Sequence, residues 1–283
     1  PSVTDRYNDA AAEIQRLIKS ALDNKEGFRA YGSAWSLSHI AHQKDNMQFN
    51  AAMNLKRPVA ADELHPNTNF LQENLFLFQC GNIIKEISNF LFQNGKSLKT
   101  TGASNGQTIA GCMSTDMHGS ALEVGAVQDY VVGINLIIGN NAEDIVYLER
   151  HTKPALNDVF ASRIKARVIR NDGLFNAALV SLGSFGFIHG VVIEAEDRFL
   201  LNRYVKKISK DKALELAQTM DFENSDFHID GETDGNGRPN RPFHYKIFIN
   251  PYTNDTEYAV ELMYKKPYRS DYPDPVPLIK TSI

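Results

Sequence analysis

Three glycine-rich segments of the sequence hold residues whose types and spacing could bind a ligand. They run from Arg29 to Ser36, from Thr101 to Ser120 and from Ser181 to Gly190. Small residues let a planar ligand or a pyrophosphate lie directly against the backbone, and successive backbone N–H groups can form a concave nest for an anion. Serine and threonine hydroxyls in the same segments can donate further hydrogen bonds. The pattern predicts a site for a phosphorylated or planar ligand.

Each segment also has an ordinary structural interpretation. The first could be a tight turn that closes a strand pair, the second a surface Ω-loop, and the third a helix C-cap that precedes a strand. The second segment fits this interpretation least well. A stretch of about twenty residues without secondary structure is uncommon inside a compact domain unless it has a function.

Motifs of several other functional classes are absent. The sequence contains no Gly-x-Gly-x-x-Gly, no Gly-x-x-x-x-Gly-Lys-Ser/Thr and no His-Glu-x-x-His. A Rossmann site, a P-loop and a zincin centre are therefore unsupported. Asp230 to Asn236 resembles the start of a calcium loop, but Arg241 occupies the position of the bidentate glutamate. We expect a solvated hairpin loop there and no metal site.

Composition sets broad limits on the partners of the chain. It has 283 residues, 42% hydrophobic and 23% charged, with a formal net charge of −4. Because no basic excess exists to neutralise a phosphate backbone, nucleic acid is not an expected partner. The longest apolar runs, such as Val131 to Ile138, are far shorter than a membrane span. Two cysteines, Cys80 and Cys112, cannot form a disulfide framework, which favours a reducing and, by default, cytoplasmic compartment. The oligomeric state stays open.

The elements that must position the three segments mix helices and strands without a regular repeat. Helical spacing of apolar residues predicts a helix from Asp9 to Leu22 and another after Gly81 that ends at Gly95. We expect strands at 75–79, 130–138, 144–148, 187–195, 243–250 and 257–264, and helices at 159–169, 175–182 and 209–220. This order favours an α+β fold. The composition changes after Asp197, which predicts a domain boundary nearby.

Taken together, the three segments resemble the vanillyl-alcohol oxidase, or p-cresol methylhydroxylase (PCMH), family of FAD-binding flavoproteins. The family's first loop, Arg-x-x-Gly-Ser-Gly-His-Ser, is similar to Arg29-Ala-Tyr-Gly-Ser-Ala-Trp-Ser36. Its second, Gln-Thr-Ile-Ala-Gly followed by Ser-Thr-Gly-Thr-His-Gly-Ser, is similar to Gln107 to Gly111 and Ser114 to Ser120. Its third, Ser-Leu-Gly-x-x-Gly-Ile-Ile, is similar to Ser181 to Ile188. The sequence most resembles the sugar-alcohol, aldonolactone and bacterial cholesterol oxidase branch.

The resemblance implies a PCMH-type FAD-binding domain of two α+β subdomains at residues 1–198. A partial α/β substrate, or cap, domain would follow at residues 199–283. The pyrophosphate of FAD would lie on Arg29 to Ser36 and Gly102 to Gly106, the flavin ring on Gly111 to Ser120, and the adenosine on Gly183 to Ile188. The FAD contacts that the resemblance implies are Arg29, Tyr31, Gly32, Ser33, Ala34, Trp35, Ser36, Gly102, Ala103, Ser104, Asn105, Gln107, Thr108, Gly111, Cys112, Ser114, Thr115, His118, Gly119, Ser120, Gly183, Gly186 and Ile188.

Trp35 departs from the family motif. Many members have a histidine there that bonds covalently to the flavin, and an indole cannot form that bond, so FAD should be held non-covalently. The resemblance places His118 near the flavin ring as a catalytic candidate. Lys246, in a segment similar to the cap strand that runs past the flavin, is a second candidate, although polarity on an exposed strand explains it equally well.

The function that the resemblance implies is an FAD-dependent oxidoreductase, most simply an oxidase, acting on CH–OH groups. Hydride would pass from an alcohol-type carbon of a polyol, sugar lactone or sterol to the flavin, and then to O2 or another acceptor. Two alternatives stay open. One is an FAD subunit or reductase of the same fold, of the molybdenum hydroxylase medium-subunit type. The other is a catalytically degenerate flavin-binding module.

Overall fold

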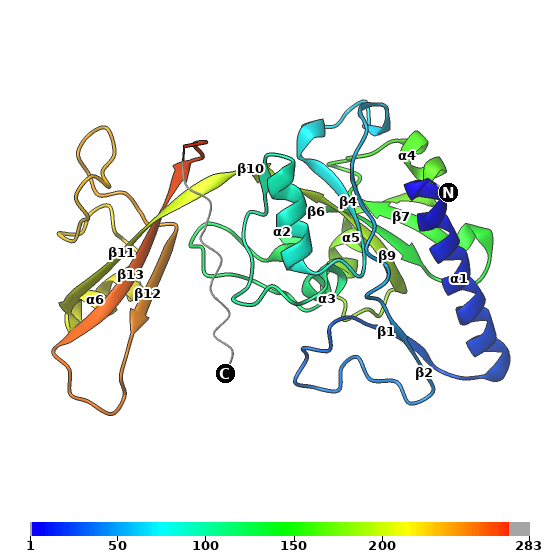
Figure 1. Ribbon diagram of the computed structural model, residues 1–283, viewed down its shortest axis with the longest axis horizontal. Helices are drawn as coiled ribbons and strands as arrows, with labels where there is room; N and C mark the ends of the chain where they lie inside the picture. The colour runs from blue at the N-terminus through cyan, green and yellow to red at the C-terminus, as the bar shows by residue number, and fades with distance from the viewer. Residues whose placement is uncertain (1, 272–283) are drawn as a thin grey trace. The chain divides into compact units, whose positions relative to one another are not determined.

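The computed structural model describes residues 2–271, and its contacts divide the chain into two compact units between Asp197 and Arg198 (Figure 1). This division coincides with the change of composition that the sequence shows after Asp197. The roles expected for the two units, FAD binding and substrate binding, stay predictions. Each unit is described by itself below.

A six-stranded sheet forms the centre of the first unit. Its strand order is β3-β4-β9-β6-β7-β8, and neighbouring strands are antiparallel except for the parallel pair β7 and β8. The strands are β3 (Lys56–Pro58), β4 (Leu75–Gln79), β6 (Val131–Ile137), β7 (Ile145–Glu149), β8 (Arg167–Arg170) and β9 (Phe187–Glu194). Two smaller sheets accompany it: β1 (Phe28–Tyr31) pairs in parallel with β2 (Asn46–Phe49), and β5 (Lys96–Ser97) pairs antiparallel with β10 (Glu196–Asp197).

Helices cover both faces of the large sheet. They are α1 (Val3–Asn24), α2 (Ile84–Gln93), α3 (Ile109–Ser114), α4 (Asp158–Arg163) and α5 (Asp172–Leu179). Phe76 and Phe78 of β4 pack with residues of α2, α3 and α5, whereas Leu75 and Leu77 pack with residues of α1 and α4. Successive side chains of a strand point to opposite faces, so one strand contributes to both layers of the core. The mixed architecture agrees with the α+β fold that the sequence predicts.

Burial on both faces corrects one expectation about the central strands. The residue pattern at 130–138 and 144–148 predicts two alternating strands. Instead every residue of β6 and β7 is buried. The strands β4 and β9 lie where the sequence predicts them, whereas the first helix begins at Val3, six residues before the predicted start at Asp9. Gly95 has the left-handed φ of 76° expected just past the end of α2.

Two further expectations fail where tertiary contacts override local patterns. The helix expected at 159–169 ends at Arg163, and Arg167 to Arg170 form β8 beside β7. The buried carboxylate of Glu149 accepts a hydrogen bond from Arg170 Nε at 2.7 Å, which holds this edge strand. The glycines and other small residues of the segment 100–125 predict that it contributes little to the core. It contains α3, whose Ile109, Cys112 and Met113 are buried.

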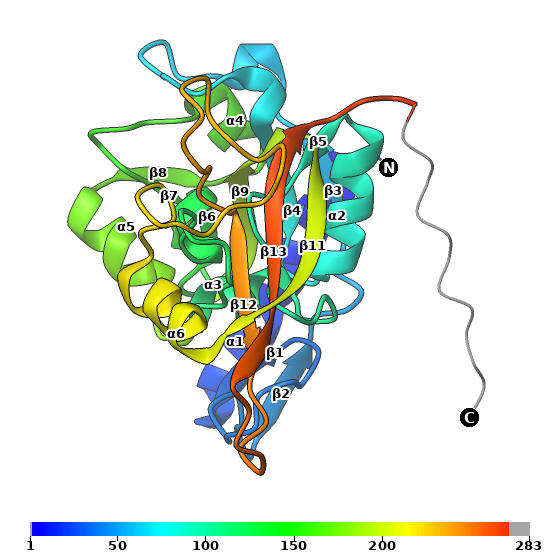
Figure 2. The same cartoon turned by 90° about the vertical axis from the view of Figure 1, so that its left-hand side faces the viewer.

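The second unit is a three-stranded antiparallel sheet with a helix on one face (Figure 2). The strand order is β11 (Phe199–Ser209), β13 (Glu257–Pro267) and β12 (His244–Phe248), and α6 (Lys210–Thr219) follows β11. The Tyr245 hydroxyl donates to the Ala213 carbonyl at 3.1 Å, which ties β12 to α6. The segment 230–236 is a hairpin turn, as expected, with a bridge between Thr233 and Pro239. Within residues 2–271, none of the helices combines the length and apolar character needed to cross a membrane.

Candidate cofactor site

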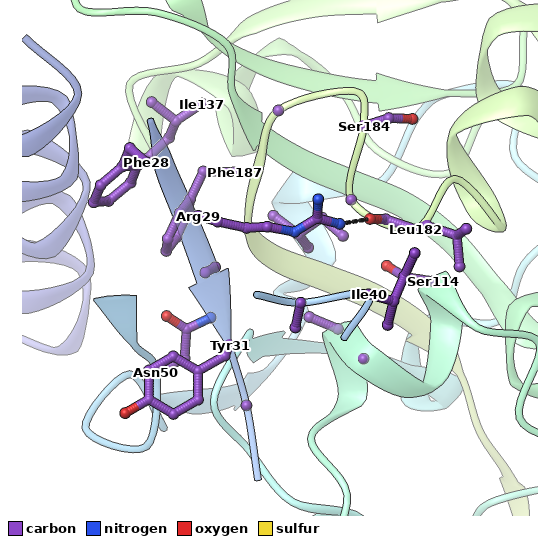
Figure 3. Close-up of a pocket in the computed structure, with 18 of the residues that line it drawn as sticks. Phe28, Arg29, Tyr31, Ile40, Asn50, Ser114, Ile137, Leu182, Ser184 and Phe187 are labelled. Atoms are coloured by element: carbon purple, nitrogen blue, oxygen red, sulfur yellow. Dashed lines mark hydrogen bonds between the residues drawn. The ribbon is translucent and has the colours of Figure 1, made fainter. Parts of the chain in front are cut away.

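A cavity of about 430 Å³ in the first unit lies where the three glycine-rich segments meet (Figure 3). Segments far apart in the sequence form its wall: the end of α1, β1, the start of α3, the end of β6 and the turn that leads into β9. The predicted cofactor contacts that line it are Arg29, Tyr31, Gly32, Thr108, Gly111, Ser114, Thr115, Gly183, Gly186 and Ile188. The structure thus brings residues of all three segments to one cavity.

Close packing joins the first two segments. A Cβ atom on Gly32 would stand 2.1 Å from Thr108 Oγ1, so only a glycine allows this approach. A Cβ atom on Gly106 would stand 2.7 Å from the Trp35 indole, so that ring lies against the backbone of the second segment. These two contacts hold the turn after β1 against the start of α3.

Arg29 joins the first segment to the third. Its Nη2 atom donates a hydrogen bond to the Leu182 carbonyl at 2.6 Å (Figure 3). Leu182 and Gly183 both have left-handed backbone, with φ of 53° and 76°, and this turn directs the carbonyl toward β1. No carboxylate of the described residues forms an ion pair with Arg29. Its positive charge therefore lies at the cavity wall, where it suits a phosphate.

The rest of the wall is mainly apolar, and most of it lies outside the three glycine-rich segments. It is formed by Ile18, Ala21, Leu22, Phe28, Ala30, Ile40, Ala41, Ala110, Ile137, Ile138, Leu182 and Phe187, with the polar residues Glu26, Asn50 and Ser184. Leu22 and Ile138 are 60% and 48% exposed. Apolar spacing in the first helix indicates a buried face, but it cannot show that the last turn of this face borders a cavity rather than the core.

Other predicted contacts do not line this cavity, and they stay predictions. They are Ser33, Ala34, Trp35, Ser36, Gly102, Ala103, Ser104, Asn105, Gln107, Cys112, His118, Gly119 and Ser120. The Cys112 side chain is buried in the core with its Sγ atom 3.2 Å from Met117 Sδ. Burial raises the pKa of this thiol to about 12, so it is protonated at neutral pH.

Gly111 and Gly119 of the second segment differ in how closely other atoms of the chain pack against them. A Cβ atom on Gly119 would stand 2.3 Å from Thr100 Oγ1 and 2.5 Å from the Thr101 carbonyl oxygen. Packing within the chain therefore already requires Gly119 to be a glycine. A Cβ atom on Gly111 would meet only Thr108 Oγ1, at 3.3 Å. Of the two glycines, Gly111 alone lines the cavity.

His118 and Lys246 are both exposed. His118 Nδ1 lies 2.9 Å from the Gly119 carbonyl oxygen. Because a carbonyl only accepts, Nδ1 carries the proton of the neutral ring and Nε2 keeps its lone pair. Lys246 belongs to the second unit, where its Nζ atom lies 4.4 Å from the centroid of the Phe248 ring. Neither side chain is part of an apolar core.

Comparisons with known proteins agree with this fold. No protein-family model matches the chain. The D-arabinono-1,4-lactone oxidase of Yarrowia lipolytica is 25% identical over 176 residues, which cover 62% of this chain and 28% of that protein. Alkyldihydroxyacetonephosphate synthase matches 90% of this chain and 45% of its own at a TM-score of 0.62 and 13% identity. Cholesterol oxidase from Brevibacterium sterolicum matches 89% and 43% at a TM-score of 0.58 and 14% identity. The chain has the PCMH-type FAD-binding fold. The chain spans about a third of the length of the first curated relatives that it matches.

The residues that line this cavity have the chemistry that FAD requires. Arg29 would supply a cation for the pyrophosphate, and Gly111 leaves the backbone open to close approach. Apolar side chains such as Phe28 and Phe187 suit the face of a planar ring. Within residues 2–271, no group of three or more His, Cys, Asp or Glu side chains could hold a metal ion.

Proposed function

We propose that this chain binds FAD non-covalently and serves the oxidation of an alcohol-type carbon in a small substrate such as a polyol, sugar lactone or sterol. The observation that carries this proposal is the meeting of the three glycine-rich segments around one cavity whose wall includes Arg29, an arginine without an ion pair among the described residues. The names of the similar proteins, a lactone oxidase and a cholesterol oxidase, support the substrate range. The electron acceptor would be O2 or another oxidant.

The residues of the chain have distinct tasks in this proposal. Arg29 and the backbone at Gly32 bind the pyrophosphate. The apolar wall around Phe28 and Phe187 excludes water from the aromatic ring of FAD that it contacts. FAD, when bound, accepts a hydride from the substrate carbon. His118 offers Nε2 as a hydrogen-bond acceptor or proton acceptor on the exposed side of the second segment.

Non-covalent binding follows from the side chains at the positions where a flavin link could form. Trp35 stands in the place of the linking histidine and has no nucleophilic ring nitrogen. Cys112 is buried, and its raised pKa of about 12 leaves almost no thiolate to attack the flavin. Among the described residues, neither of these two candidates can form the bond.

A flavin-reduction experiment tests the proposal. The purified protein is incubated with FAD, desalted, and mixed under anaerobic conditions with polyols, aldonolactones or sterols while the oxidised flavin band is recorded. We expect a yellow protein whose band bleaches with one of these classes and whose FAD is released intact by acid. A colourless protein after incubation would overturn the proposal. A yellow protein that no substrate bleaches would support flavin binding alone and contradict the proposed oxidation.

A further inference from the structure

Asn50 is a buried amide at the cavity wall, and no sequence pattern marks it as a candidate contact. Its side chain lies beside Tyr31 at the β1 side of the cavity (Figure 3), and the residue is only 4% exposed. Its Oδ1 atom is closed off from water and has no hydrogen-bond partner. Such an atom destabilises a fold unless a partner arrives. Of the described residues with an orphaned buried side-chain atom, Asn50 alone lines this cavity.

The backbone of Asn50 is held in place on three sides. Its N–H donates to the Tyr31 carbonyl at 3.1 Å, and its own carbonyl accepts from the Met53 N–H at 2.8 Å. Gly81 packs so closely that a Cβ atom there would stand 1.9 Å from the Asn50 carbonyl oxygen. The side chain therefore cannot move out to water by a shift of the chain. Only rotation of the amide itself can offer its donor and acceptor to a ligand.

We propose that Asn50 recognises the adenine of the bound dinucleotide, an inference that rests on the proposed function. A side-chain amide carries a donor and an acceptor side by side, which match the exocyclic amine and a ring nitrogen of adenine. The apolar side chains of Phe28 and Phe187 line the same cavity and suit the faces of a base. Gly183 and Gly186, from the segment expected to hold the adenosine, also line it. Arg29 lies at this wall as well, where its positive charge would bind the phosphates that adjoin the adenosine.

The test compares two asparagine-to-leucine variants. Asn50→Leu keeps the size of the side chain and removes both hydrogen-bonding groups. Asn74→Leu is the matched control, because Asn74 also carries a buried Oδ1 without a partner but does not line the cavity. Dissociation constants for FAD, ADP and FMN are measured by calorimetry on the apoprotein, and melting temperatures are measured without ligand.

We expect Asn50→Leu to weaken FAD and ADP binding by the same factor, roughly three- to tenfold for one or two lost hydrogen bonds. FMN binding should not change. The melting temperature of the apoprotein should stay level or rise, because an unsatisfied buried group has been removed. A residue with a purely structural role would show the opposite, with a lower melting temperature and unchanged affinity. Asn74→Leu should leave every affinity unchanged.

The other outcomes are distinct. If Asn50→Leu weakens the binding of FAD and FMN but not of ADP, the amide contacts the flavin edge and the adenine assignment fails. If the variant weakens the binding of ADP but not of FAD, or changes neither affinity, the inference also fails. Should the leucine variant not fold, Asn50→Ala is measured in its place under the same criteria. A wild-type protein that binds neither FAD nor ADP would overturn the proposed function together with this inference, whereas normal wild-type binding with an unaffected variant overturns only the inference.

Discussion

The guanidinium of Arg29 donates to the main-chain carbonyl of Leu182 at 2.6 Å, across 153 positions of sequence. This bond attaches the strand that opens the first glycine-rich segment to the turn that opens the third. It uses one of the five N–H donors of the arginine, and the remaining donors lie at a cavity wall without an ion pair among the described residues. One side chain therefore both shapes the cavity and presents its positive charge.

This dual role predicts that Arg29→Met lowers FAD affinity at least tenfold, since both the carbonyl contact and the charge are lost. Arg29→Lys should recover only part of the affinity, because an ammonium cannot reproduce the planar fork. Calorimetric titration with FAD measures both. Arg16→Met serves as the control, because Arg16 pairs with Glu13 on the surface and lies outside the cavity. Equal losses in the Arg16 and Arg29 variants would refute a specific role for Arg29.

A pair of glycine variants separates contact with the cofactor from packing. Gly111→Ala places a methyl group where only Thr108 Oγ1 is near, and alanine favours the helix α3 that contains it, so the apoprotein should keep its melting temperature. Its flavin-to-protein absorbance ratio should fall. Gly119→Ala should instead lower the melting temperature, because its Cβ meets the Thr101 carbonyl oxygen. Full flavin occupancy in a folded Gly111→Ala protein would count against the cavity as the FAD site.

Replacing His118 should change redox behaviour and not stability. The ring is exposed and makes one hydrogen bond to the neighbouring carbonyl, so His118→Ala should change the melting temperature of the apoprotein little. We expect slower anaerobic flavin reduction or a shifted flavin potential, followed by stopped-flow absorbance and dye titration. Reduction at the wild-type rate and potential would show that the ring does not act on the flavin.

His189 predicts a specific sensitivity to acid. The ring is fully buried against Tyr7, its Nε2 donates to the Tyr7 carbonyl at 3.0 Å, and its Nδ1 has no partner. Burial lowers the pKa of this imidazole to about 4 in the folded protein, below its ordinary value of 6.5. The unfolded chain therefore binds a proton first as pH falls, so stability is lost between pH 6.5 and pH 4, by about 3 kcal/mol in all.

The measurement compares denaturant unfolding of the wild type and His189→Gln across this pH range. The amide retains a donor for the Tyr7 carbonyl and cannot be protonated there. As pH falls, the unfolding free energy of the wild type should decrease more than that of the variant. Other groups titrate in both proteins, so the difference between the two reports on residue 189. A difference that stays constant from pH 7 to pH 4 would show that His189 is not the group responsible.

The sequence by itself determined the parts that depend on local patterns. Strand β4 and strand β9 were predicted within a residue because continuous apolar runs between turn residues leave few alternatives. The order of the three glycine-rich segments indicated the PCMH-type fold. Ten of the contacts that the family resemblance implies, from Arg29 to Ile188, line one cavity.

Tertiary structure alone decided what depends on partners distant in the chain. Arg167 to Arg170 form a strand and not a helix, because β7 offers a free edge and Glu149 a buried carboxylate, and neither is visible in the local pattern. Asn50 borders the cavity because β1 and Gly81 hold its backbone there. A single asparagine after a short strand carries no signal of its own. Its role arises from the desolvation imposed by neighbours that only the folded chain brings together.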